Sequence, residues 1–594
     1  MDKRLKALRQ KLREEKLSAF LVPHTDEHQS EYTPSYAERL EWITGFKGSA
    51  GFSVVSLNQA AIFVDGRYTL QVRDQVDLSL FSTLKLHQDQ VEDWLFDNLD
   101  EGNVVGYDPW LHSKKWLEKA ERKLSPKNIS LKAVTKNPID EVWLDRPEPS
   151  KALAKLHQDK YSGEKSSLKR RRIAGEVKSK GADALVLTAL DSIAWLFNIR
   201  GSDVDTTPLV LSFAILYNTG KAALFIDPDK IDDDILKHLG KQVKHYPKED
   251  FTSALQKLGK DGLKVMADPK SAHAAIFEAL QSSDAVIIEA DDPCQLDKAC
   301  KNDVELDGTR NAHIRDAVAV CKFLCWVDEN TPSSKIDEID AVNKLLELRK
   351  EVFLFQGVSF DTISGAGPNG AIVHYKVTEE TSRKLENNII FLVDSGGQYL
   401  DGTTDITRTI AIGKPTEEQR NNFTRVLKGH IALAQARFPV GRTGAHLDTL
   451  ARKSLWDVGL DYDHGTGHGV GSYLGVHEGP QSISPLAYNV PLKPGMIISN
   501  EPGYYKTGEY GIRIENLVIV GNSKYEEEER PMLTFETITM VPIDTRLVNV
   551  HMMTAAEITW LNIYHAKVRE KIMPFLKGKD KEWLIQATEA ITIV

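Results

Sequence analysis

The sequence predicts three domains, two of one α/β type followed by a third of the α+β class. The chain has 594 residues, which is too many for a single hydrophobic core. Its first half contains two diverged copies of one pattern. From about Ile389 onward, β-branched segments with glycine turns alternate with helical stretches. We therefore expect domains at residues 1–157, 158–303 and 304–594.

The two copies in the first half share the order of their features. Residues 42–49 (WITGFKGS) match residues 195–202 (WLFNIRGS) in character at most positions. Further along, residues 60–65 (AAIFVD) are echoed by residues 222–227 (AALFID). A charged helix and an apolar strand precede each copy. Because the order is kept, an internal duplication explains the pattern better than chance similarity between buried strands.

Composition excludes several classes of protein. The net charge is −10, and the one basic run, residues 169–172, is predicted to be a solvated helix face, so a nucleic-acid binder is not expected. No apolar run approaches the roughly 20 residues of a membrane span. The first twelve residues form a charged amphipathic pattern without the apolar stretch of a secretory signal. The four cysteines fit no usual zinc spacing and are expected to be reduced thiols, so a cytoplasmic protein is predicted.

Four carboxylates and one imidazole in the last third are the candidate functional residues. Each lies in a short glycine-rich or β-branched motif: Asp394, Asp405, His468, Glu501 and Glu515. Crowded together, four negative charges would repel strongly unless cations lay between them. This set therefore predicts a site for a pair of divalent ions.

The local sequence places these residues mostly on strands. Residues 389–394 read as a buried strand that ends in Asp394, and Asp401-Gly402 predicts a hairpin turn before the strand with Asp405. Whether both carboxylates face one side depends on bulges in that turn. Alternation in residues 512–520 predicts that Arg513 and Glu515 share one face of a strand.

Together, in this order, the motifs resemble the binuclear metallopeptidases of the pita-bread fold, among them methionine aminopeptidase, prolidase, creatinase and aminopeptidase P. The whole chain most resembles the long, three-domain, cytosolic type of aminopeptidase P. That resemblance implies two tandem creatinase-like α/β domains before a pita-bread catalytic domain. It also implies that the five residues are the metal ligands, with Asp405 and Glu515 bridging both ions.

The same resemblance implies a mechanism. A hydroxide that bridges the two ions would attack the peptide bond, and Glu501 would shuttle its proton. His374, in the segment 367–375 (GPNGAIVHY), and His477 would hydrogen-bond the oxyanion, while His464 would position the substrate. Tyr505 and Arg513 resemble family residues that line the substrate region. A core tyrosine and a surface salt bridge are equal alternatives for these two.

The implied activity is removal of the first residue from peptides whose second residue is proline. The oxygen-rich ligand set favours Mn(II), with Zn or Co as alternatives, and a homodimer is expected from the resemblance. Two other functions stay open: a prolidase that cuts only Xaa-Pro dipeptides, and a non-catalytic pita-bread binding module. Arg67 is expected to form a structural ion pair rather than to reach the substrate.

Overall fold

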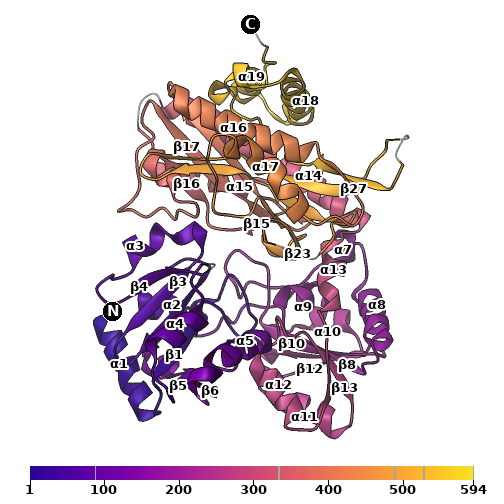
Figure 1. Ribbon diagram of the computed structural model, residues 1–594. Helices are drawn as coiled ribbons and strands as arrows, with labels where there is room; N and C mark the ends of the chain where they lie inside the picture. Colours follow the sequence, from indigo (N-terminus) through magenta and orange to yellow (C-terminus); the bar gives the residue numbers. More distant parts are fainter. Residues whose placement is uncertain (87, 332–334, 487–489, 526–528, 593–594) are drawn as a thin grey trace. The chain divides into compact units, whose positions relative to one another are not determined.

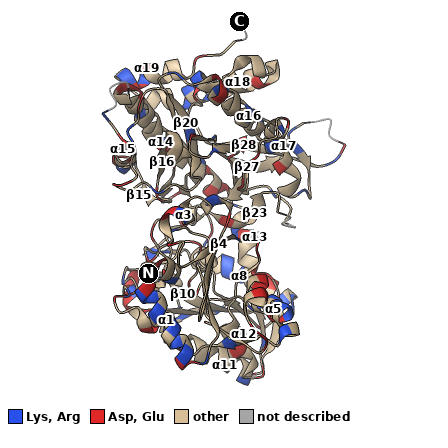
Figure 2. Ribbon diagram, turned by 60° about the vertical axis from the view of Figure 1, so that its left-hand side comes forward, with Lys and Arg blue, Asp and Glu red and all other residues tan. Residues whose placement is uncertain are grey.

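The chain folds into two compact units (Figure 1), and basic and acidic residues are spread over both of them (Figure 2). Each unit has its own hydrophobic clusters. One unit comprises Met1–Asp159 and Glu164–Cys294, and the other comprises Lys160–Gly163 and Gln295–Val594. The computed structural model describes residues 1–86, 88–331, 335–486, 490–525 and 529–592.

The first unit contains two six-stranded mixed sheets of the same topology. The strand orders are β4-β3-β2-β1-β5-β6 and β12-β11-β10-β8-β13-β14. In each sheet three consecutive strands pair antiparallel and the outer strands join in parallel. The shared topology confirms the internal duplication. The strands are β1 (Ala19–Pro23), β2 (Gly51–Ser56), β3 (Ala60–Val64), β4 (Ser82–Lys85), β5 (Val104–Tyr107), β6 (Ser130–Ala133), β8 (Ala184–Leu187), β10 (Ser212–Tyr217), β11 (Ala222–Ile226), β12 (Val243–Tyr246), β13 (Lys264–Ala267) and β14 (Val286–Glu289).

Two helices that follow equivalent strands join the halves of this unit. The N–H of Lys115 donates to the carbonyl of Pro269 (3.1 Å), and the N–H of Ala275 donates to the carbonyl of Pro109 (3.0 Å). The first N–H groups of a helix have no partner inside it. In each half, a backbone carbonyl therefore accepts a hydrogen bond from the first turn of the helix in the other half. The two helices are α5 (Lys114–Leu124) and α12 (Ala274–Gln281).

The prediction of a solvated basic run was wrong for two of its four residues. Lys169 and Arg170 lie on the buried face of α8 (Ser166–Ser179). Lys169 Nζ donates hydrogen bonds to the carbonyl of Trp195 (3.2 Å) and to Oδ1 of Asn198 (2.9 Å). These bonds offset the cost of burying the ammonium group.

The second unit is built around antiparallel sheets. A three-stranded sheet has the order β16-β17-β20, and a six-stranded sheet has the order β21-β28-β27-β24-β22-β23. Two small sheets have the orders β15-β18-β19 and β25-β26. The strands are β15 (Phe355–Val358), β16 (Ile363–Ala366), β17 (Ile389–Ser395), β18 (Gly397–Tyr399), β19 (Gly402–Thr403), β20 (Ile406–Ile412), β21 (Arg437–Pro439), β22 (Gly467–Gly469), β23 (Glu478–Ile483), β24 (Ile497–Asn500), β25 (Gly503–Lys506), β26 (Tyr510–Arg513), β27 (Asn516–Asn522) and β28 (Met532–Thr537).

Helices pack on these sheets. One hydrophobic core joins six of the described helices to β17 and β20. Four of these helices start with a capping box, which explains where they begin. The N-cap residues are Asn302, Asp337, Thr416 and Thr554. Within the described part of the chain, no helix combines the length and apolar content needed to cross a bilayer. The six helices in this core are α14 (Asp303–Asn330), α15 (Glu338–Lys350), α16 (Glu417–Ala434), α17 (Ala445–Trp456), α18 (Ala555–Ile572) and α19 (Gly578–Ala587).

The single strand predicted over residues 512–520 is interrupted. β26 ends at Arg513 and β27 begins at Asn516, so Glu515 lies between two strands of different sheets. The N–H of Glu515 donates instead to the carbonyl of Thr407 in β20 (3.2 Å). The prediction that Arg513 and Glu515 share one strand was therefore wrong, and alternation along a strand does not set the direction of the Glu515 side chain.

Candidate metal centre

A hairpin of the three-stranded sheet positions two of the predicted ligands. Asp394 is the penultimate residue of β17 and pairs with Thr407, while Asp405 directly precedes β20. Between them, β18 and β19 form the irregular turn that the sequence left open. Both carboxylates are buried, so the hairpin directs them into the interior of the unit.

His468 lies on β22 with its ring oriented by a backbone hydrogen bond. Its Nδ1 donates to the carbonyl of Gly469 (3.0 Å), so the proton sits on that nitrogen. Nε2 then faces the carboxylates, 3.4 Å from Oδ2 of Asp405 and 3.5 Å from Oε1 of Glu501. A backbone bond on one ring nitrogen commonly orients the other toward a metal.

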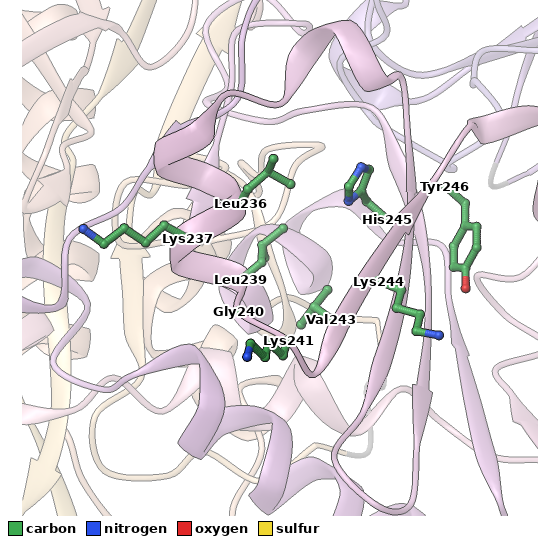
Figure 3. A pocket seen from close by; sticks show the side chains of 9 residues that line it. All are labelled: Leu236, Lys237, Leu239, Gly240, Lys241, Val243, Lys244, His245 and Tyr246. Atoms are coloured by element: carbon green, nitrogen blue, oxygen red, sulfur yellow. The ribbon is translucent and has the colours of Figure 1, made fainter.

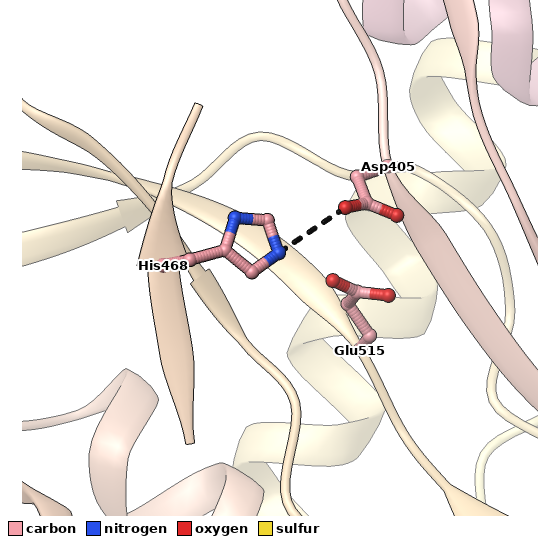
Figure 4. Close-up of side chains that lie close together, drawn as sticks. All are labelled: Asp405, His468 and Glu515. Atoms are coloured by element: carbon pink, nitrogen blue, oxygen red, sulfur yellow. Dashed lines mark ion pairs between the residues drawn. The ribbon is translucent and has the colours of Figure 1, made fainter. Parts of the chain in front are cut away.

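Two glutamates from neighbouring strands complete the group. Glu501 follows β24, and Glu515 precedes β27. One candidate ligand atom from each of Asp405, His468 and Glu515 lies within 4.8 Å of the others, and Figure 4 shows these three side chains converging. Residues far apart in the sequence thus form one compact cluster.

The electrostatics of this cluster favour protonated carboxyl groups in the absence of cations. Burial raises the pKa of Glu501 to about 7, and the carboxylates of Asp405 and Asp394 add to the rise. Burial also raises the pKa of Glu515 well above its usual range. Burial alone would lower the pKa of His468, but the carboxylates of Asp405 and Glu501 raise it to about 9. A cation bound among these groups would stabilise the ionised carboxylates and the neutral imidazole, so it would lower all three pKa values.

The donor set suits divalent cations. It offers carboxylate oxygens and one imidazole nitrogen, which are ligands of hard and borderline ions. Oδ1 of Asp394 is buried and has no hydrogen-bond partner among the described residues. A buried carboxylate oxygen without a partner is costly, and a bound cation would supply one.

A buried arginine links this cluster to a tyrosine and a second histidine. Arg513 donates from Nη2 to Oδ2 of Asp394 (2.6 Å) and from Nη1 to the hydroxyl of Tyr505 (2.7 Å). That hydroxyl also lies 2.9 Å from Nε2 of His464. Only 2% of Arg513 is exposed, so a surface salt bridge does not describe it.

The other two predicted histidines lie in different segments of the same unit. The ring of His477 contacts that of His468, with ring centroids 4.3 Å apart. His374 is half-buried shortly after the short 3-10 helix η7 (Gly367–Ala371). That helix lies against β26, where a Cβ on Gly511 would be 1.7 Å from the carbonyl oxygen of Gly370. Only glycine permits this approach.

Sequence reasoning missed Thr407. Its hydroxyl donates to Oε2 of Glu515 (2.8 Å) and accepts from Nε of Arg513 (3.1 Å). Thr407 therefore brings the Arg513 and Glu515 side chains to one place, although they do not share a strand. Its position two residues after Asp405 was the only signal in the sequence.

Arg67, in the first unit, forms the ion pair that was expected. Its Nη2 lies 2.6 Å from Oδ2 of Asp65, and its Nη1 lies 3.5 Å from Oε1 of Glu31. Both acids belong to the same unit as Arg67, so the charge of its guanidinium group is neutralised within that unit.

A hollow in the first unit contains none of the predicted site residues. It lies between the short helix α10 (Asp233–Leu239) and β12 (Figure 3). Three lysines and no carboxylate line it, so it offers no cation site. The lining residues are Leu236, Lys237, Leu239, Gly240, Lys241, Val243, Lys244, His245 and Tyr246.

The antiparallel sheets and their cluster of buried carboxylates define a metallohydrolase of the pita-bread class. Models of known families agree with this class along most of the chain. The metallopeptidase family M24 matches residues 307–522, and the C-terminal region of peptidase M24 matches residues 531–591. The creatinase/prolidase N-terminal domain matches twice, at residues 4–141 and 145–305.

Individual relatives are similar over nearly the full length. A probable Xaa-Pro aminopeptidase P of Aspergillus fumigatus is 41% identical, covering 99% of this chain and 93% of the relative. Aminopeptidase P1 of Arabidopsis thaliana is 38% identical, covering 97% of both chains. The crystal structure of X-prolyl aminopeptidase from Caenorhabditis elegans, described as a cytosolic enzyme with a di-nuclear active site, is 36% identical, with a TM-score of 0.95 over 99% of each chain. This chain belongs to the aminopeptidase P family of M24 metallopeptidases.

Proposed function

We propose that the protein is a metal-dependent aminopeptidase that removes the first residue from peptides whose second residue is proline. The convergence of Asp405, His468 and Glu515 within 4.8 Å, in a chain similar along its whole length to Xaa-Pro aminopeptidases, carries this proposal. Together with Asp394 and Glu501, these residues would hold two divalent ions. Mn(II) is the preferred ion, and Zn or Co are the alternatives.

Different side chains of the protein have different roles in the proposed reaction. Cations held by these residues would supply an activated water, because they would lower its pKa toward neutrality. Glu501 takes a proton from that water and returns it to the leaving amine. His374 and His477 donate hydrogen bonds to the developing oxyanion, and His464 positions the substrate. Arg513 holds the carboxylate of Asp394, and Tyr505 holds the ring of His464, in position beside the substrate.

Proline at the second position explains why a dedicated site is needed. The Xaa-Pro bond has no N–H, and the proline ring fixes its φ angle near −65°. A peptidase that requires a hydrogen bond from that N–H rejects such peptides. A site that accepts them must instead match the shape of the ring.

The organisation of the chain follows the same proposal. We divide it into creatinase-like domains at residues 1–157 and 158–303 and a catalytic domain at residues 304–594, in line with the family models. The protein is proposed to be a cytoplasmic homodimer. The cytoplasmic location is supported by the cytosolic character of the C. elegans relative.

A tripeptide assay separates this function from that of a prolidase. The purified protein with Mn(II) is expected to release glycine from Gly-Pro-Pro, whereas a prolidase would cut only the dipeptide Gly-Pro. The solved structure of the Xaa-Pro dipeptidase of Bacillus anthracis covers 64% of this chain and is 23% identical, with a TM-score of 0.51, so that likeness concerns the fold alone.

The binding-module alternative predicts a different result. With Mn(II), Zn or Co supplied in turn, such a module would hydrolyse no Xaa-Pro peptide of any length. Cleavage of Gly-Pro-Pro that disappears on chelation and returns with Mn(II) would rule out that alternative.

A further inference from the structure

A buried histidine joins the two strands that carry Glu501 and Glu515. His430 lies in α16 and has no exposed surface. It contacts Asn500 and Asn516, which are direct partners in the β24–β27 pairing. Asn500 precedes Glu501, and Asn516 follows Glu515. The histidine is therefore placed directly behind two candidate ligands.

Both ring nitrogens of His430 have a partner. Nδ1 faces the carbonyl of Asn500 at 3.1 Å and must carry the proton that it donates. Nε2 is then unprotonated and accepts a hydrogen bond from Nδ2 of Asn516 (3.1 Å). The amide of Asn500 donates back to the carbonyl of His430 (2.9 Å). One side chain thus ties α16 to both strands.

A buried arginine fixes the orientation of Asn516. Nη2 of Arg408 donates to Oδ1 of Asn516 (2.8 Å), which leaves Nδ2 of that amide to face the histidine. Nη1 of Arg408 donates to the carbonyl of Glu515 (2.6 Å). The network therefore extends from the ring of His430 to the backbone of a candidate ligand. In a buried network, each lost bond leaves a partner unsatisfied.

We propose that His430 is a positioning residue that holds Glu501 and Glu515 in the geometry needed to bind divalent cations. The proposal rests on the proposed function, in which these two glutamates are ligands. Two carboxylates from adjacent strands share a centre only while the strand ends keep their relative position. Loss of groups that orient ligands typically weakens metal binding about 10- to 100-fold.

The test compares Mn(II) binding by wild-type protein and His430→Phe in calorimetric titrations of the chelator-treated full chain. Phenylalanine keeps a planar aromatic ring and removes both hydrogen bonds. The expected result is Mn(II) affinity lower by about 10- to 100-fold, with the KM for Gly-Pro-Pro at saturating Mn(II) changed much less. His565→Phe is the matched control, because His565 is also buried and its Nε2 accepts a hydrogen bond from the N–H of Ile543 (3.1 Å).

The control separates positioning from general destabilisation. His565→Phe is expected to lower the melting temperature of the chelated protein but to keep wild-type Mn(II) affinity. Equal Mn(II) affinity in His430→Phe and wild type would overturn the inference and leave the proposed function intact. If wild type bound none of Mn(II), Zn and Co, the inference and the proposed function would both fail. If His430→Phe does not fold, Asn516→Ala decides, because it removes the amide that donates to Nε2 of His430. Unchanged affinity in that variant would also overturn the inference.

Discussion

At the scale of single residues, Glu501 stands apart from the other candidate ligands. Its Oε1 accepts a hydrogen bond from the hydroxyl of Ser499 (3.1 Å) and lies 3.5 Å from Nε2 of His468. Burial raises its carboxyl pKa to about 7. A carboxylate within hydrogen-bond reach of the reacting water can accept a proton and return it.

Replacing Glu501 with glutamine keeps its shape and removes its basicity. We expect Glu501→Gln to lower kcat for Gly-Pro-Pro by about 100-fold or more at saturating Mn(II). Glu509→Gln is the control, because Glu509 is exposed and ion-paired with Lys506. A kcat for Glu501→Gln within tenfold of the wild-type value would remove Glu501 from proton transfer.

Tyr505 joins two functional groups through one hydroxyl. We expect Tyr505→Phe to lower kcat/KM about tenfold, because the hydroxyl accepts a charge-assisted bond from Arg513 that is worth about 1.5–3 kcal/mol. Tyr504→Phe is the matched control, since alternation on β25 points the side chain of Tyr504 to the other face. Steady-state kinetics with both variants makes the comparison. Equal losses in the two would argue against a specific role for the Tyr505 hydroxyl.

At the scale of elements, the start of α15 holds the segment that carries His374. The carboxylate of Glu338 is fully buried and accepts hydrogen bonds from the N–H of Ala366 (2.6 Å), the amide of Asn369 (3.0 Å) and the hydroxyl of Tyr375 (3.0 Å). Ala366 directly precedes η7, Asn369 lies within it, and Tyr375 directly follows His374. One side chain thus anchors a whole loop.

Glu338→Gln replaces one acceptor oxygen with a donor that faces other donors. We expect the melting temperature to fall, because an unsatisfied buried group costs about 1–3 kcal/mol, and kcat to fall with it. Mn(II) content should stay unchanged. Glu347→Gln, an exposed position of the same helix, should change neither value. Loss of Mn(II) in Glu338→Gln would mean that the effect reaches the centre itself rather than the loop.

At the scale of the whole molecule, cation binding should depend on pH. In the cation-free protein the pKa of Glu501 is raised to about 7 and that of His468 to about 9, so both hold protons that must leave when a metal binds. Stability from these protonated groups is present at low pH and is lost as pH rises through the two values. The gain in melting temperature on adding Mn(II) should therefore increase from pH 6 toward pH 9.

Differential scanning calorimetry with Mn(II) or with chelator at each pH measures this gain. The difference between the two melting temperatures at one pH removes the contribution of titratable groups outside the metal centre. Titrations in buffers of different ionisation enthalpy should also show protons released on binding. A gain that is independent of pH, with no proton release, would contradict the assigned ligands.

The junction between the halves of the first unit should make that unit sensitive to acid. Burial lowers the pKa of His273, which directly precedes α12, to about 4, with Glu27 and His112 as its titratable neighbours. Its neutral ring contributes fully above the unfolded value of about 6.5, and that stability is lost as pH falls toward 4. His273→Phe should therefore gain about 2 kcal/mol relative to wild type between pH 7.5 and pH 4.5.

Denaturant unfolding followed by circular dichroism at both pH values measures the free energy of unfolding of His273→Phe relative to wild type. The exposed His245, changed to phenylalanine in the same way, is the control and should show no such difference. A wild-type protein that resists acid better than His273→Phe would contradict the assignment.

The sequence alone determined the features that depend on neighbouring positions. Spacing and periodicity identified the duplicated halves, and their common strand order confirmed that interpretation. The motifs around Asp394, Asp405, His468, Glu501 and Glu515 identified the family before any coordinates. Such features are local, because each motif carries its own turn glycines and strand pattern.

Only the tertiary structure decided which distant side chains meet. Thr407 bonds Glu515 across 108 positions, and His430 bonds Asn516 across 86. Neither contact could be predicted, since each depends on strand register and on which face of α16 turns inward. Lys169, expected in solvent, is buried because the helix packs that face against the backbone near Trp195. Contacts of this kind are set by the packing of whole elements, and no short stretch of sequence encodes them.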